Sequence, residues 1–98
     1  MPYKYSLLAV AQEDYESSIY WYIKRSLTAS KKFVNVIDKS LATICSDPKR
    51  QRNEYENYYE FTVQEYPFTI VYTIEESLKK VLIIAIYHHK RNPGNKYR

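Results

Sequence analysis

The chain has 98 residues, of which 45% are hydrophobic, so it has room for one domain with one core, expected over residues 1–98. The lone Cys45 excludes an internal disulfide, and no apolar run approaches the roughly 18 residues that a membrane span needs. The N-terminus lacks the pattern of a signal peptide. We therefore expect a cytoplasmic protein without a membrane partner, and the single glycine, Gly94, excludes a glycine-rich phosphate loop.

Positive charge is concentrated at one end of the sequence. No acidic residue follows Glu76, and six cations give this segment a charge of +6: Lys79, Lys80, Lys90, Arg91, Lys96 and Arg98. Because the whole chain carries +4, residues 1–76 sum to −2. Such a field favours an anionic partner, either nucleic acid or an acidic protein segment; the alternative is a solvated tail that aids solubility.

A strand and two helices are predicted first. Residues 3–8 alternate large and polar side chains, which is typical of a half-buried strand. Apolar residues then recur at three- and four-residue steps and predict a helix over about 10–25. A second helix starts after an N-cap at Ser26 or Thr28 and ends at Asp47-Pro48. The short connection predicts an antiparallel helical hairpin, with Cys45 as a core residue of the second helix.

The rest of the chain reads mainly as strands. Residues 49–57 are polar and predict an irregular loop or a poorly formed edge strand. Period-two alternation predicts strands over 59–64 and 68–74, and the apolar run 81–86 suits a strand covered on both faces. The order predicts an α+β domain in which an N-terminal strand and an antiparallel helical hairpin precede a mostly antiparallel three-strand meander. We expect the last strand to be central and the hairpin to cover one face of the sheet.

The residues after the last strand carry the candidate chemistry. His88 and His89 are adjacent, so their side chains should point to opposite faces and cannot share a metal; we expect neither a metal nor a cofactor. His88 could move protons or bind phosphate, or it could be a strand-end residue bonded to a backbone carbonyl. Together with Lys96, Tyr97 and Arg98, it provides the groups that a metal-independent ribonuclease needs. The same groups could clamp an acidic peptide.

Several motifs together resemble the RelE/ParE superfamily of bacterial type II toxins along nearly the whole chain. The more specific segments are residues 66–72, similar to a Tyr/Phe-Pro-Tyr-x-Ile-x-Tyr strand pair, and residues 86–93, similar to Val-x-His-x-x-Arg-x-Pro. Weaker matches follow in the family's order and spacing: Asp14-Tyr15, Tyr22, Ala29, Phe33 and Asp47-Pro48. The resemblance implies the fold described above.

The resemblance also implies a function in a toxin–antitoxin, or plasmid stabilisation, module. A cognate acidic antitoxin would wrap the domain, and the target would be either DNA gyrase, as in ParE-like members, or messenger RNA on the ribosome, which RelE-like members cut. A third alternative is a degenerate member that has lost toxicity.

Sheet arginines typical of ribosome-dependent members are replaced here by Tyr59 and Thr69, which favours gyrase inhibition over RNA cleavage. Tyr59 is expected to pack in the sheet rather than act on RNA. The candidate catalytic residues are His88, Arg91, Tyr97 and Arg98. The candidate residues for binding the target or the antitoxin are Lys49, Arg50, Arg52, Lys90, Arg91 and Lys96.

Overall fold

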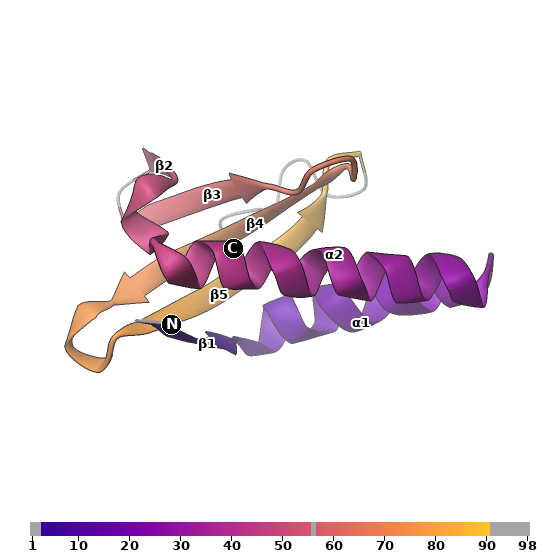
Figure 1. Ribbon diagram of the computed structural model, residues 1–98, viewed down its shortest axis with the longest axis horizontal. Helices are drawn as coiled ribbons and strands as arrows, with labels where there is room; N and C mark the ends of the chain where they lie inside the picture. The colour runs from indigo at the N-terminus through magenta and orange to yellow at the C-terminus, as the bar shows by residue number, and fades with distance from the viewer. Residues whose placement is uncertain (1–2, 56, 91–98) are drawn as a thin grey trace.

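A computed structural model describes residues 3–55 and 57–90 (Figure 1). Two helices and five strands follow in the order β1 (Lys4–Leu7), α1 (Ala9–Ile23), α2 (Leu27–Ser46), β2 (Arg52–Tyr55), β3 (Tyr58–Thr62), β4 (Phe68–Glu75) and β5 (Lys80–His88). Two short 3₁₀ turns, η1 (Pro48–Arg50) and η2 (Glu76–Leu78), precede β2 and β5. The α+β class and the order of elements agree with the sequence prediction.

The two helices form the predicted antiparallel hairpin, and its outer end projects beyond the sheet (Figure 1). Ser26 is the N-cap of α2, because its Oγ accepts a hydrogen bond of 3.2 Å from the backbone N–H of Ala29. Thr28, the other candidate cap, lies inside the helix. The apolar stripe of α2 is buried as expected, and it consists of Phe33, Ile37, Leu41, Ile44 and Cys45.

The five strands form one sheet in the order β1-β5-β4-β3-β2. Three of its pairings are antiparallel, and β1 pairs parallel to β5. The last strand is therefore interior, as expected, but the middle position belongs to β4. Of the two predictions for 49–57, the structure agrees with the poorly formed edge strand, because β2 follows η1 at the edge of the sheet and pairs irregularly with β3.

The main core lies between the helices and the sheet. An aromatic column runs through it, from Tyr22 stacked on Phe33 at 4.8 Å to Phe68, whose ring centroid lies 5.1 Å from that of Phe33. Tyr72 is fully buried, and its hydroxyl donates a hydrogen bond of 2.6 Å to the backbone carbonyl of Pro48. Burial raises the pKa of this phenol, so it remains a donor that fixes η1 to the core.

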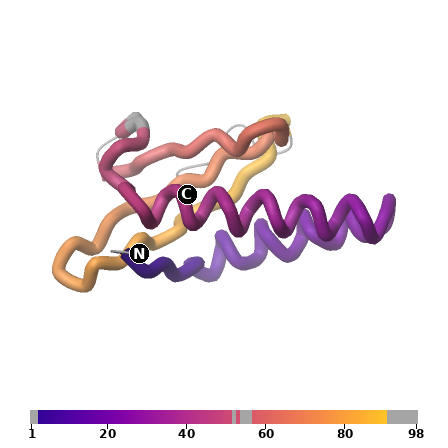
Figure 2. Tube along the Cα trace, viewed as in Figure 1, coloured from indigo at the N-terminus to yellow at the C-terminus, as the bar shows by residue number. Residues whose placement is uncertain are grey.

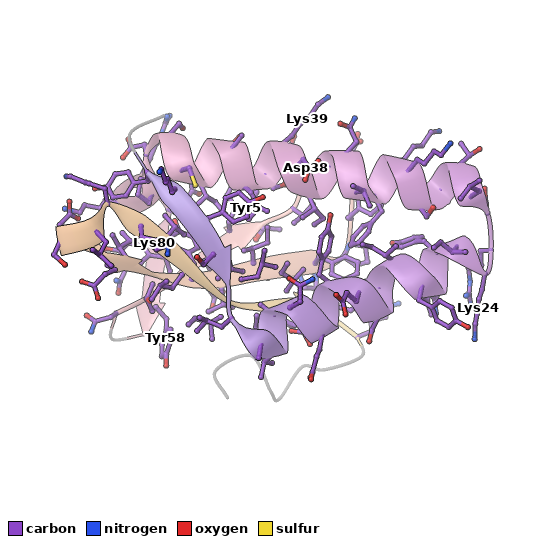
Figure 3. All side chains as sticks on the ribbon, turned by 90° about the horizontal axis from the view of Figure 1, so that it is seen from below. Tyr5, Lys24, Asp38, Lys39, Tyr58 and Lys80 are labelled. Atoms are coloured by element: carbon purple, nitrogen blue, oxygen red, sulfur yellow. The ribbon has the colours of Figure 1, made fainter. Side chains whose placement is uncertain are left out.

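Strand β5 has buried side chains on both faces. Val81, Ile83 and Ile86 belong to the main core, whereas Ala85 and Tyr87 join Val71 in a smaller cluster on the opposite face. This opposite face, turned away from the helices, is called the far face below. Figure 3 shows Tyr58, which packs on the smaller cluster, pointing away from α2.

A bulge in β5 explains this pattern. Val71 pairs with Ala85 and Tyr72 pairs with Ile83, so Ile84 has no partner in the register. The extra residue lets Ile83 and Ile86 both face the helices, although they are three residues apart. Beyond the end of β1, the backbone N–H of Ile86 donates to the carboxylate of Asp14 in α1 at 3.2 Å. This contact fixes the last part of β5 to the first helix.

Candidate functional site

The end of β5 places an imidazole on the far face. Thr69 of β4 pairs with Tyr87, and its hydroxyl lies 2.8 Å from Nε2 of His89. The ring of Tyr87 packs against that of His89 at 5.8 Å, and the backbone N–H of His89 donates to the carbonyl of Pro67 at 2.9 Å. These three contacts hold a group that can accept or donate a proton at the end of the sheet.

His88 points the other way, as strand alternation predicts. Its ring meets the core residue Phe68 edge-on at 5.1 Å, and its Nδ1 accepts a hydrogen bond of 3.1 Å from the backbone N–H of Lys90. Sequence reasoning ranked His88 above His89, yet His89 is the histidine that reaches the far face. The period-two alternation from Tyr87 to His89 was the signal that could have revealed it.

Lys49 lies at the opposite end of the sheet from the two histidines at the end of β5. Lys49 forms an ion pair of 3.1 Å with Glu76, next to the turn between β4 and β5. The same carboxylate accepts from Lys79 at 2.8 Å and from the hydroxyl of Tyr3 at 2.9 Å. The hydrogen bonds from Lys79, Tyr3 and Lys49, in that order of importance, lower the pKa of Glu76 to about 2. The structure therefore does not bring Lys49 to the end that holds His88.

The other predicted site residues are partly described. Arg50 is exposed in η1, beside Lys49, and Lys90 is exposed just after β5. The backbone of Arg52 pairs with Glu60 in the register of β2 and β3. The remaining candidates lie outside the described residues: Arg91, Lys96, Tyr97 and Arg98.

Metal and thiol chemistry find no support within residues 3–55 and 57–90. No group of three metal-ligating side chains occurs in this part of the chain. Cys45 is 1% exposed, and burial raises the pKa of its thiol, which opposes a role as a nucleophile. None of the described helices is long and apolar enough to cross a membrane.

The sequence of this chain matches a known protein family over most of its length. A model of the ParE toxin family, the toxin of the type II toxin–antitoxin system parDE, matches residues 5–93. The chain belongs to the ParE toxin family. The match includes His88 and Arg91, whereas Lys96, Tyr97 and Arg98 follow it. No curated protein matches the chain in sequence.

Solved structures agree with this ParE assignment at the level of the fold. The chain is similar to a chain of the chromosomal ParDE system from P. aeruginosa, with a TM-score of 0.75 and 14% identity over 89% of this chain and 96% of that one. It is similar to a chain of the RelBE2 complex from Mycobacterium tuberculosis, with a TM-score of 0.60 and 15% identity over 90% and 99% of the two chains. The chain is also similar to a mutant E. coli RelE bound to an antitoxin RelBc peptide. Here the TM-score is 0.57, with 15% identity over 88% of this chain and 82% of that one.

The two sheet positions that the sequence singled out in this ParE family member, Tyr59 and Thr69, lie on different faces of the sheet. Tyr59 stacks on Tyr72 with centroids 5.4 Å apart and packs on the main core, as predicted, so it is not a far-face residue. The position of β3 that faces the same side as Val71 is the next one, Glu60, which is only 5% exposed. Thr69 does face this side, beside His89. The middle strands thus bring a carboxylate and a hydroxyl to the far face.

Proposed function

We propose that this protein is the toxin of a type II pair that is held inactive by an acidic antitoxin and inhibits DNA gyrase. Family membership supports the toxin role, and the ParDE and RelBE likenesses support an antitoxin partner. The observation that carries the choice of target is the chemistry of the far face, where the middle strands present Glu60 and Thr69.

Metal-independent RNA cleavage requires cations that neutralise the charge developing on the phosphate. On the far face, the described side chains of the middle strands include Glu60 and Thr69, and neither of these two brings a positive charge. The imidazole of His89 can transfer a proton, but a general base alone leaves the charge on the phosphate unopposed. These features favour binding of a protein target over cleavage of RNA.

The basic end, which means Lys90 and the cations that follow it in the sequence, then acts as a binding surface. Lys90 is exposed at the end of β5, and Arg91, Lys96 and Arg98 follow it in the sequence. Because the sequence from Lys90 onward has cations and no acidic residue, its charge favours acidic protein surfaces, on the target and on the antitoxin alike.

The decisive experiment measures two activities of one preparation. Purified protein should inhibit supercoiling by DNA gyrase, and the antitoxin should restore supercoiling at equimolar amounts. After induction in cells, double-strand DNA breaks should appear without new ribosome-phased ends in messenger RNA. New messenger RNA ends with unimpaired supercoiling would establish the nuclease instead.

A variant at the Thr69–His89 pair separates the two functions further. Thr69→Val removes the hydroxyl that lies 2.8 Å from Nε2 of His89 and keeps the shape of the side chain. Gyrase inhibition should stay within about twofold of wild type, whereas a nuclease that uses this imidazole should lose at least about tenfold in rate. An equal loss in gyrase inhibition would contradict the proposal.

Removal of residues 93–98 tests the basic end. Since this change deletes Lys96 and Arg98, it should abolish growth arrest while thermal unfolding of the truncated protein remains cooperative. Full growth arrest by the truncated protein would refute the role of the C-terminal cations.

A further inference from the structure

The outer end of the helical hairpin exposes an unusual set of side chains. Four large apolar residues around the connection between α1 and α2 are 37–61% exposed: Tyr20, Trp21, Ile23 and Leu27. Soluble proteins tolerate such residues singly, but a contiguous exposed group marks a contact surface. The name hairpin tip is used below for this group together with the neighbouring cations Lys24, Arg25, Lys31 and Lys32. Figure 1 shows that it extends past the sheet, at the end towards which β5 runs.

The hairpin tip is also strongly basic. It carries Lys24, Arg25, Lys31 and Lys32, and the sequence has no acidic residue between Glu16 and Asp38. Arg25 lies 3.5 Å above the ring of Trp21, and Lys24 lies 4.7 Å above the ring of Tyr20. These cation–π contacts hold positive charge directly over the exposed aromatic rings. Figure 3 shows Lys24 at this outer end, well away from Lys80 at the start of β5.

Ring contacts connect the hairpin tip to the end of β5. Trp21 meets Tyr22 edge-on at 5.0 Å, and the column through Tyr22, Phe33 and Phe68 ends at His88, 5.1 Å from Phe68. Each member of the column is packed against the next. The ring contacts therefore join the hairpin tip to the end of β5 at His88.

We propose that the hairpin tip is part of the target-binding surface and binds an acidic, partly apolar surface of the protein target. This inference rests on the proposed function. Charge complementarity predicts an acidic partner surface, because the hairpin tip carries four cations and no acidic residue. Trp, Tyr and Arg side chains supply most of the binding free energy in protein interfaces, and the hairpin tip presents all three types.

The aliphatic side chains select a protein over a nucleic acid. Ile23 is 46% exposed and Leu27 is 61% exposed, and neither has a ring on which a base could stack. Both side chains stabilise a complex only when their apolar surface is buried away from water. A pocket in a protein target provides that environment next to acidic groups that meet Lys31 and Lys32.

The test compares matched substitutions at the two ends of the molecule. Leu27→Gln alters the hairpin tip, and Leu78→Gln alters a residue of η2 that is 68% exposed at the other end. Lys31→Glu with Lys32→Glu removes the net positive charge of the hairpin tip, and Lys4→Glu with Lys39→Glu makes the same charge change elsewhere. The hairpin-tip variants should raise the half-inhibitory concentration for gyrase at least about tenfold, and the controls at most about twofold.

Antitoxin affinity and growth arrest complete the test. The hairpin-tip variants should bind the antitoxin within about twofold of wild type and should no longer arrest growth at matched expression. Hairpin-tip variants that inhibit gyrase like wild type would overturn the inference while leaving the proposed function intact. If wild-type protein does not inhibit gyrase, the proposed function fails, and growth arrest by the same variants still decides the role of the hairpin tip.

The intrinsic fluorescence of the hairpin tip detects other partners, because Trp21 is the single tryptophan of the chain. A blue shift with vesicles of two parts phosphatidylcholine to one part phosphatidylglycerol would assign the hairpin tip to a lipid surface. Quenching by a single-stranded oligonucleotide would assign it to nucleic acid. Either result, if lost in Leu27→Gln and retained in Leu78→Gln, would overturn the assignment to a protein target.

Discussion

The two ends of the sheet are stabilised in different ways. At the end near His88, rings pack on rings, and the column from Phe33 through Phe68 is buried. At the end near Glu76, one carboxylate holds Tyr3, Lys49 and Lys79, and the lysine and glutamate side chains are about half exposed or more. Salt screens exposed ion pairs, whereas it does not screen apolar burial. Lys49 therefore stabilises the fold at one end, whereas packed rings hold the candidate functional residues in place at the other end.

The largest expected effect comes from breaking the packed end. Phe68→Ala removes a fully buried ring that contacts both Phe33 and His88. Loss of a buried Phe side chain costs about 3–5 kcal/mol, because the cavity collapses only in part. Urea unfolding should show this loss, and Leu78→Ala, an exposed control, should change the free energy of unfolding by at most about 0.5 kcal/mol. A small effect of Phe68→Ala would mean that the ring column does not support the end of β5.

An intermediate effect is expected where the core meets η1. Tyr72→Phe keeps the ring but removes the donor to the carbonyl of Pro48, so that a buried acceptor loses its partner. Such a loss costs about 1–3 kcal/mol. Hydrogen exchange of the amides around η1 should increase more than that of β5. An unchanged free energy of unfolding would show that water replaces the phenol.

The smallest effect is expected at Glu76, and it should depend on pH. Its folded pKa of about 2 lies below the ordinary value of 4.5, so its stabilising contribution is present above pH 4.5 and is lost as the pH falls towards 2. Glu76→Gln should therefore lower the melting temperature slightly near neutral pH and flatten the acid side of the stability profile. The difference between the two proteins should shrink in high salt. A difference that persists at pH 2 would point to packing instead.

Local sequence patterns were sufficient to predict the helices and the central strands. The stripe from Phe33 to Ile44 repeats every three or four residues because one side of α2 packs on the sheet, and Ser26 is a chemically typical cap. Strand β2 was harder to predict, since an edge strand pairs through its backbone and Arg52–Tyr55 has no apolar alternation.

Features that depend on distant residues could not be predicted in the same way. The bulge at Ile84 is hidden in a continuous apolar run, so the sequence does not tell which of its residues face the helices. The partner of Lys49 is Glu76, in another turn of the chain, and no local pattern links them. The hairpin tip is difficult to recognise in the sequence because the excess of cations after Glu76 dominates the charge pattern, although Lys24, Arg25, Lys31 and Lys32 are equally free of nearby acids.

The parallel pairing of β1 with β5 has a consequence for protein synthesis. Lys4 pairs with Lys80, so the first strand to be made has no partner until the last strand has emerged from the ribosome (Figure 2). Asp14 of α1 likewise waits for the backbone of Ile86. Contacts between residues so far apart form late, because closing a long loop costs entropy before any contact repays it. The domain therefore completes its fold only after nearly all of it has been translated, and a nascent chain that lacks β5 has neither a complete sheet nor the end that carries His89.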